Sequence, residues 1–102
     1  MKIIKLLSER IESELEDGEF YAKSAVLYRE EHPEIARAFY EISLEEMRHV
    51  DILHGKVTEM IEKHKREKGD PPADMLAIWR YVHERNIEWA NEIKNYQNQY
   101  LK

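Results

Sequence analysis

The chain contains no cysteine, and only three glycines and three prolines occur in its 102 residues. Without cysteine it can form neither disulfides nor thiolate metal sites, and it has no thiol nucleophile. Long apolar runs are also missing, so no segment is expected to span a membrane. The Met1–Leu7 stretch is too short for the apolar core of a signal peptide. We therefore expect a cytoplasmic protein.

Positive charge is scarce relative to negative charge. Asp and Glu number 21 against 16 Lys and Arg, which gives a formal net charge of −5. No basic stripe follows any segment, so a nucleic-acid partner is not expected. A single domain of this size buries only about 60–65% of the surface of its unfolded chain. We expect one domain over residues 1–102 that gains further stability by associating with other copies.

Three long segments remain between the few glycines and prolines, at about residues 2–31, 34–67 and 73–101. Pro33 separates the first two, and Gly69–Pro72 separates the last two. Within each segment apolar residues recur every three or four positions, which is typical of packed helices. Proline is favoured in the first turn of a helix, so the first connection is short and the first two helices form an antiparallel hairpin. The predicted fold is all-α, a helix hairpin plus a third helix.

Polar residues interrupt the apolar stripe at the centre of both hairpin helices. At about 100° per residue, Glu14 lies on the inward face of the first helix, and Glu46 and His49 lie on that of the second. The spacing of three brings the last two together on adjacent turns. In a hairpin that turns near residues 31–33, Gly18 is level with Glu46. Glu14 lies one helical turn farther from the connection.

Two other glutamates of the first helix, Glu16 and Glu19, have the right height but the wrong direction. They point about 160° and 140° away from Glu14. The geometry therefore favours Glu14 as the partner of the Glu-x-x-His pair.

An unpaired carboxylate among apolar side chains costs several kcal/mol. A divalent metal held by Glu14, Glu46 and His49 would remove this penalty, and oxygen with imidazole ligands suits Fe, Mn or Zn. The alternative for Glu14 is an ordinary ion pair with Arg10, which lies one turn earlier. His54 and His64 are not expected to be ligands.

Di-iron carboxylate sites of four-helix bundles use four carboxylates and two histidines, and one chain supplies half of this set. The third segment contains His83, Glu84 and Glu88 but no Glu-x-x-His. We therefore expect a homodimer in which two hairpins complete one four-helix bundle with two metal ions at each dimer site.

Residues 10–55 resemble the encapsulated ferritin family and, more loosely, the rubrerythrin and ferritin-like superfamily of di-iron carboxylate proteins. The shared features are Glu14 followed seven residues later by Tyr21, a turn at Pro33, and the sequence from Glu46 to His49. The resemblance implies a ferroxidase that oxidises Fe(II) to Fe(III) for iron storage or detoxification. It also implies a ring of dimers that delivers iron into an encapsulin shell, inside which the protein would reside.

By this resemblance Glu14, Glu46 and His49 match the metal ligands, and Tyr21 matches a tyrosine that lies behind them. Glu16 matches an acidic position where a second metal ion could bind or enter. Spacing alone also leaves Glu16 as a rival ligand. The final residues, Tyr100–Lys102, contain no recognisable encapsulin-targeting tail, which leaves encapsulation open.

Two further functions fit the same residues. A rubrerythrin-like peroxide reductase would use the same iron site but would need an electron donor. A metal-free structural module for helical oligomerisation would hold the buried glutamates and histidine in a hydrogen-bonded network.

Overall fold

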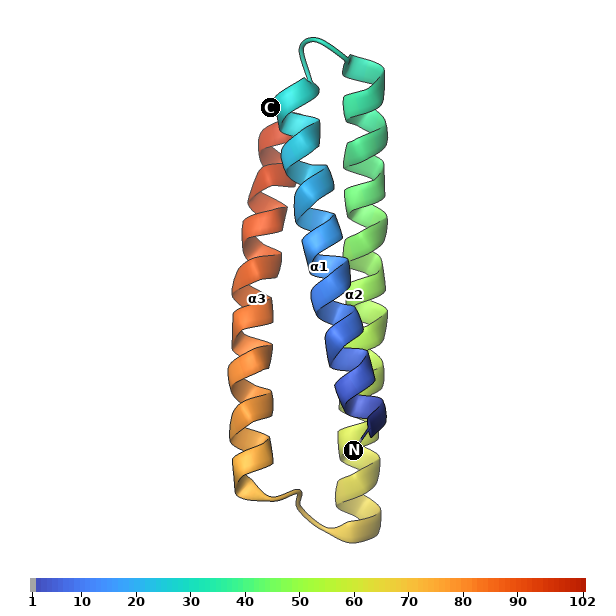
Figure 1. The fold of residues 1–102 in the computed structure, drawn as a ribbon, viewed down its shortest axis with the longest axis vertical. Helices are drawn as coiled ribbons and strands as arrows, with labels where there is room; N and C mark the ends of the chain where they lie inside the picture. The colour runs from blue at the N-terminus through green and yellow to red at the C-terminus, as the bar shows by residue number, and fades with distance from the viewer. Residues whose placement is uncertain (1) are drawn as a thin grey trace.

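The computed structural model describes residues 2–102 and consists of three helices, each antiparallel to the one before it (Figure 1). Helix α1 spans Lys2–Tyr28, α2 spans Pro33–Lys68 and α3 spans Ala73–Leu101. No strand occurs within these residues. The all-α prediction is confirmed, and Pro33 begins α2 as expected.

Helix α1 ends at Tyr28, three residues before the predicted boundary at residue 31. The difference follows from Pro33, because a residue that precedes proline avoids the helical conformation. His32 accordingly has a φ of −136° and a ψ of 68°. The backbone N–H of His32 donates to the Tyr28 carbonyl at 2.9 Å, which closes the turn.

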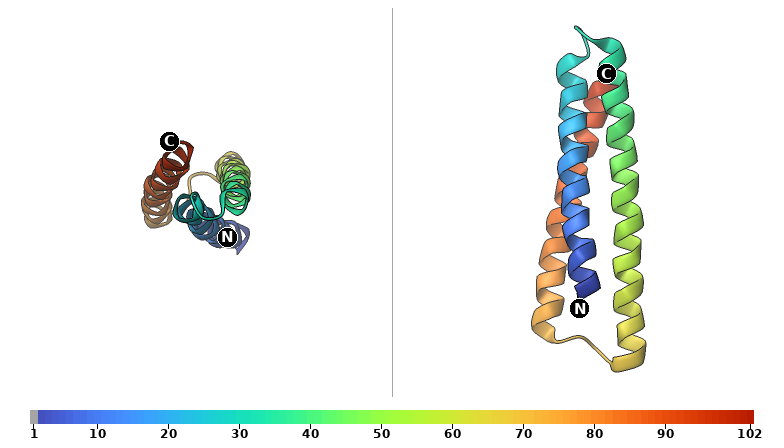
Figure 2. Two further views of the ribbon diagram at one scale, coloured as in Figure 1. Left: turned by 90° about the horizontal axis from the view of Figure 1, so that it is seen from above. Right: turned by 45° about the vertical axis from the view of Figure 1, so that its right-hand side comes forward.

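The connection between α2 and α3 also has a local cause. Gly69 has a φ of +83°, a left-handed conformation that favours glycine, and its N–H donates to the Lys65 carbonyl at 3.1 Å. Pro71 and Pro72 then prevent α2 from continuing. The chain reverses, so α3 runs parallel to α1 (Figure 2).

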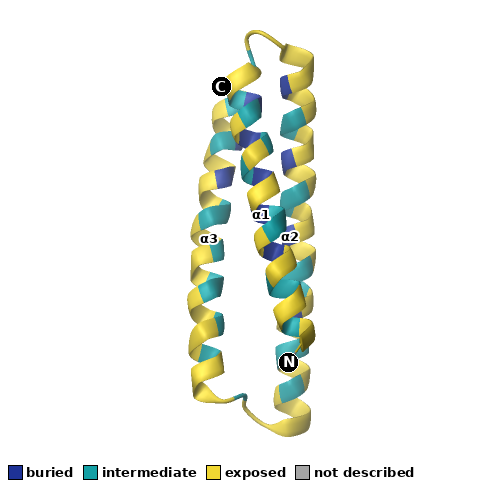
Figure 3. Ribbon diagram, viewed as in Figure 1, coloured by how far each residue is buried: buried dark blue, intermediate teal, exposed yellow. Residues whose placement is uncertain are grey.

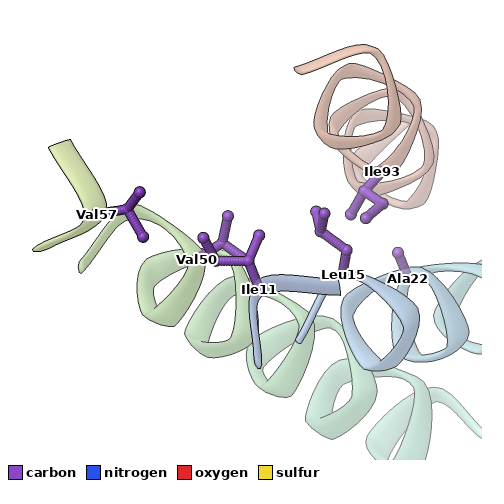
Figure 4. Close-up of a cluster of buried hydrophobic side chains, with 6 residues drawn as sticks. All are labelled: Ile11, Leu15, Ala22, Val50, Val57 and Ile93. Atoms are coloured by element: carbon purple, nitrogen blue, oxygen red, sulfur yellow. The ribbon is translucent and has the colours of Figure 1, made fainter. Parts of the chain in front are cut away.

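The core lies chiefly between α1 and α2, and α3 covers one side of this hairpin. Helix α3 packs against α1 and makes few contacts with α2. Figure 3 shows that buried residues gather on the inner sides of the helices while the outer sides are exposed. The core side chains, six of them drawn in Figure 4, are Ile11, Leu15, Ala22, Ala25, Ala36, Val50, Val57 and Ile93.

A buried polar contact ties the three helices together. The Ser43 hydroxyl on α2 donates to the Gly18 carbonyl on α1 at 2.8 Å. The Gln97 amide on α3 donates to the Ser43 hydroxyl at 2.9 Å. Both side chains are buried, so their hydrogen bonds offset the loss of hydration. The contact fixes the level of α3 against the hairpin.

Part of the expected apolar stripe is not buried within one chain. Ile35 and Ile42 belong to the apolar repeat of the second segment, yet they are 51% and 37% exposed. They lie on a side of α2 that α3 does not cover. None of the three helices, over the residues that the structure describes, has a stretch apolar enough to cross a bilayer.

Helices α2 and α3 are in contact through His54 and His83. The Nε2 atom of His54 lies 2.9 Å from Nδ1 of His83, and both rings are partly buried. Burial lowers the pKa of His54 below its usual value of 6.5, His83 lowers it further, and the Asp51 carboxylate acts in the opposite direction.

We expect the protein to lose stability as the pH falls from about 7.5 to about 5.5. The folded state holds His54 neutral more strongly than the unfolded chain does, so the unfolded chain takes up the proton first, near pH 6.5, and is favoured as the pH falls. Urea unfolding at several pH values measures this loss. The free energy of unfolding should depend less on pH in His54→Gln. The dependence should be unchanged in His32→Gln, which alters an exposed histidine at the first turn.

Candidate metal centre

Glu14, Glu46 and His49 converge near the middle of the hairpin. One ligand atom from each lies within 4.8 Å of the others, and within residues 2–102 no other group of three His, Asp or Glu side chains does so. The Nδ1 atom of His49 lies 3.3 Å from Oε2 of Glu14 and 3.9 Å from Oε2 of Glu46. The two residues of α2 stand three positions apart, on adjacent turns that face α1.

Gly18 allows α1 to approach α2 at this level. A Cβ atom at Gly18 would lie 3.1 Å from Sδ of Met47 and 3.6 Å from Cβ of Glu46. The hydrogen bond from Ser43 to the Gly18 carbonyl forms on the same close approach. The register expected from the hairpin, with Gly18 beside Glu46, is therefore confirmed.

Gly18→Val is expected to lower the free energy of unfolding by about 1–3 kcal/mol, because extra methyl groups in a closely packed contact cause strain. It should also weaken metal binding, since α1 would carry Glu14 away from Glu46. Gly18→Ala is the matched control: Met47 can move its flexible end, and alanine favours a helix by about 1 kcal/mol over glycine. Urea unfolding in the presence of a chelator measures the stability of both variants. A Gly18→Val protein as stable as the wild type would show that the close approach is not required.

The carboxylates are mostly buried, whereas the imidazole is partly open. The side chains of Glu14 and Glu46 are 14% and 18% exposed, and that of His49 is 49% exposed. Oε2 of Glu46 is buried and has no hydrogen-bond partner. Such an oxygen costs free energy unless a cation or a hydrogen-bond donor reaches it.

Glu14 has a second partner besides His49. Its Oε1 atom lies 3.3 Å from Nη2 of Arg10, so the ion pair that was the alternative for Glu14 is formed. The Arg10 side chain is 56% exposed, and an exposed pair of this kind contributes little stability. Arg10 can therefore turn into solvent when a cation takes its place beside Glu14.

Glu14 and His49 face an open depression on the hairpin, and Glu46 lies beside them. The depression is lined by residues of α1 and α2 alone, which are Arg10, Glu14, His49, Ile52 and Leu53. Two carboxylates and one imidazole fit Fe²⁺, Mn²⁺ or Zn²⁺, and the buried oxygen of Glu46 without a partner is the observation that favours a cation. One chain leaves most coordination positions unfilled, so a second set of ligands can approach from outside.

The other candidate residues lie apart from this cluster. The Tyr21 ring packs on Phe20 and Phe39, at centroid distances of 5.2 and 5.6 Å. Glu16 is exposed and lies outside the ligand group. Glu19 faces α3, where it pairs with Lys23 at 2.7 Å and accepts a hydrogen bond from the Trp89 indole. The hydrogen bond from Lys23 is the main reason why the pKa of Glu19 is lowered.

The model of one protein family, described as rubrerythrin, matches residues 5–101, which is nearly the whole chain. No curated protein and no solved structure matches the chain. The family match covers all three helices and includes Glu14, Glu46 and His49.

Proposed function

The chain belongs to the rubrerythrin family, within the ferritin-like superfamily of di-iron carboxylate proteins, and from this premise we propose that two copies form a ferroxidase centre between them. The observation that carries the proposal is the convergence of Glu14, Glu46 and His49, of which Glu14 and His49 line an open depression. A two-fold axis beside this face would bring together four carboxylates and two histidines, the set that di-iron bundles use.

The apolar surface around the ligands supports association at this face. Ile42 stands seven residues before His49 and Ile35 eleven residues before Glu46, so each points within about 20° of its ligand. These isoleucines are 37% and 51% exposed in one chain. A second hairpin would bury them and complete a four-helix bundle around the metal ions.

In this proposal ferrous iron is the substrate. Two Fe(II) ions lose one electron each, and the two electrons with two protons reduce dioxygen to hydrogen peroxide, or peroxide to two waters. Glu46 would bind between the ions or chelate one, Glu14 would bind at the outer side, and a ring nitrogen of His49 would hold one ion per chain. Negative carboxylates stabilise Fe(III) more than Fe(II), which favours the oxidation.

Tyr21 and Glu16 have subsidiary places in the proposal. Tyr21 lies two turns from Glu14 on α1 and would hold the packing behind the ligands. The exposed Glu16 would attract cations on their way to the site, or bind a second type of ion. Mn²⁺ and Zn²⁺ would occupy the same ligands without the oxidation chemistry.

Anaerobic titration with Fe(II), followed by air, tests the proposal. Ferric absorbance should saturate near about one iron per chain, and the solution mass should correspond to a dimer or a ring of dimers. The metal-free structural module predicts the same mass and melting temperature with iron and with chelator. Assembly that depends on metal would exclude that module, because ligands shared between chains couple binding to association.

The family match also favours a second activity, reduction of hydrogen peroxide at the same centre. It would require electrons from outside these 102 residues, since they contain no cysteine for a rubredoxin-type iron site. Comparing the oxidation rates of the ferrous protein with peroxide and with dioxygen separates the two activities. A much faster reaction with peroxide would favour the reductase.

Encapsulation follows from the ferroxidase proposal as a further step. A ring of dimers inside an encapsulin shell would pass Fe(III) into the shell for storage. Co-expression with an encapsulin, followed by purification of intact shells, would show whether the chain is retained inside them.

A further inference from the structure

A pair of histidines joins α2 to α3 away from the Glu14 cluster. The rings of His54 and His83 lie 4.4 Å apart between centroids and are inclined by 18°. Nε2 of His54 and Nδ1 of His83 are 2.9 Å apart, so one ring donates its hydrogen to the other. This contact stands out because α2 and α3 otherwise make few contacts.

Trp79 holds both rings in place. Its centroid lies 6.2 Å from that of His54 and 5.7 Å from that of His83, and the ring planes are inclined by 20° and 18° respectively. The three rings therefore form one stacked group at the contact between α2 and α3.

The pH decides whether the pair can bind a metal ion. A histidine binds metal only as neutral imidazole, so the site should fill above about pH 6.5, the usual pKa of histidine. Asp51 lies one turn before His54, with the same spacing of three as Glu46 and His49. Its carboxylate supplies a nearby negative charge that would attract a cation.

We propose that His54 and His83 form a second metal site, which takes a divalent ion that prefers nitrogen ligands, such as Cu²⁺ or Ni²⁺. Bonds of about 2.0–2.1 Å to one ion at a right angle place two nitrogens about 2.9 Å apart, which is the separation found here. A tetrahedral ion such as Zn²⁺ would require about 3.4 Å. On binding, the hydrogen of the donating nitrogen moves to the other nitrogen of the same ring by exchange with water. Both rings then turn about their Cβ–Cγ bonds to direct a lone pair at the ion.

This site differs in chemistry from the Glu14 cluster. Its two nitrogen ligands favour ions late in the series from Mn²⁺ to Cu²⁺, whereas the carboxylates favour iron and manganese. Water, or the Asp51 carboxylate after rotation, would fill the remaining positions. An ion held between α2 and α3 would fasten the first half of α3 to the hairpin, which couples metal binding to the position of α3.

Fluorescence quenching tests the proposal, because the chain has two tryptophans and one of them stacks on the pair. The protein for the test carries His49→Ala, which removes a ligand of the other site, and Trp89→Phe, which leaves Trp79 as the reporter. Titration with Cu²⁺ at pH 7.5 should quench the fluorescence several-fold and saturate at about one ion per chain. Adding His54→Gln or His83→Gln should weaken the apparent affinity at least about tenfold. The matched protein with Trp79→Phe in place of Trp89→Phe should be quenched much less.

A second measurement keeps both His54 and His83 in the protein. The electron paramagnetic resonance spectrum of one equivalent of Cu²⁺ bound to the His49→Ala protein should show coupling to two imidazole nitrogens. Coupling to a single nitrogen would overturn the proposal, as would quenching that persists in both glutamine variants or fails to occur in the parent.

Discussion

A Glu46→Leu protein is expected to oxidise Fe(II) at about one hundredth of the wild-type rate or less, because the proposed two-fold centre would lose two of its six ligands at once. Leucine has a similar volume and keeps the surrounding helix contacts. Glu46 also carries the buried oxygen that has no hydrogen bond, which favours a cation beside it. Ferric absorbance after mixing ferrous protein with air measures the rate.

Without metal the same substitution should raise stability, by about 1–3 kcal/mol, since it removes a buried polar group that lacks a partner. A hydrogen-bonded network without metal would predict the opposite sign. Glu45→Leu is the matched control, because Glu45 is exposed and pairs only with Arg48 at 3.8 Å. Glu16→Leu tests the rival ligand. An unchanged rate in Glu46→Leu, or an equal loss in Glu16→Leu, would contradict the assignment.

The helices and the cluster of ligands could be predicted because both depend on short-range rules. The spacing of apolar residues and the position of Pro33 predict the hairpin. The hairpin then sets which residues are level, and this arithmetic placed Gly18 beside Glu46, where the structure has them. A turn that shifted by two residues would have moved the level by four, which is more than a helical turn. Pro33 is thus the residue on which the predicted site depends.

The packing of α3 could not be predicted in the same way. Its stripe of apolar residues places Asn86 near the centre, yet the buried polar residue is Gln97. Gln97 donates to Ser43, which lies 54 positions earlier, and no local pattern connects two residues so far apart. Trp89 of α3 likewise donates to Glu19 of α1, which lies 70 positions earlier.

The contact between His54 and His83 could have been anticipated in part from the second turn. Because α2 and α3 turn near residues 69–72, residues of the two helices lie at the same height when their numbers sum to about 140. The numbers 54 and 83 sum to 137, so the two histidines are nearly level. Direction, however, depends on how α3 rotates about its axis, which the sequence alone leaves undetermined.

If two chains associate as proposed, replacing Ile42 by aspartate is expected to separate them while leaving each chain folded. Ile42 lies on the same side of α2 as His49, and a two-fold axis would bring its copies near each other across the seam. Burying an aspartate there costs several kcal/mol, and each 1.4 kcal/mol is tenfold in affinity, so association should weaken at least about a hundredfold. Sedimentation at micromolar concentration should show a single chain, with helix content unchanged by circular dichroism.

Iron oxidation should fall with the loss of the dimer, although Glu14, Glu46 and His49 are all present in the Ile42→Asp protein. The matched control is Ile78→Asp, which changes an isoleucine of α3 that is 64% exposed and lies outside this face. Activity per chain should depend on concentration in the Ile42→Asp protein and recover at high concentration, because half of the ligands must come from a second chain. A monomeric Ile42→Asp protein that oxidises iron at the wild-type rate would show that one chain is sufficient, and the shared centre would then be wrong.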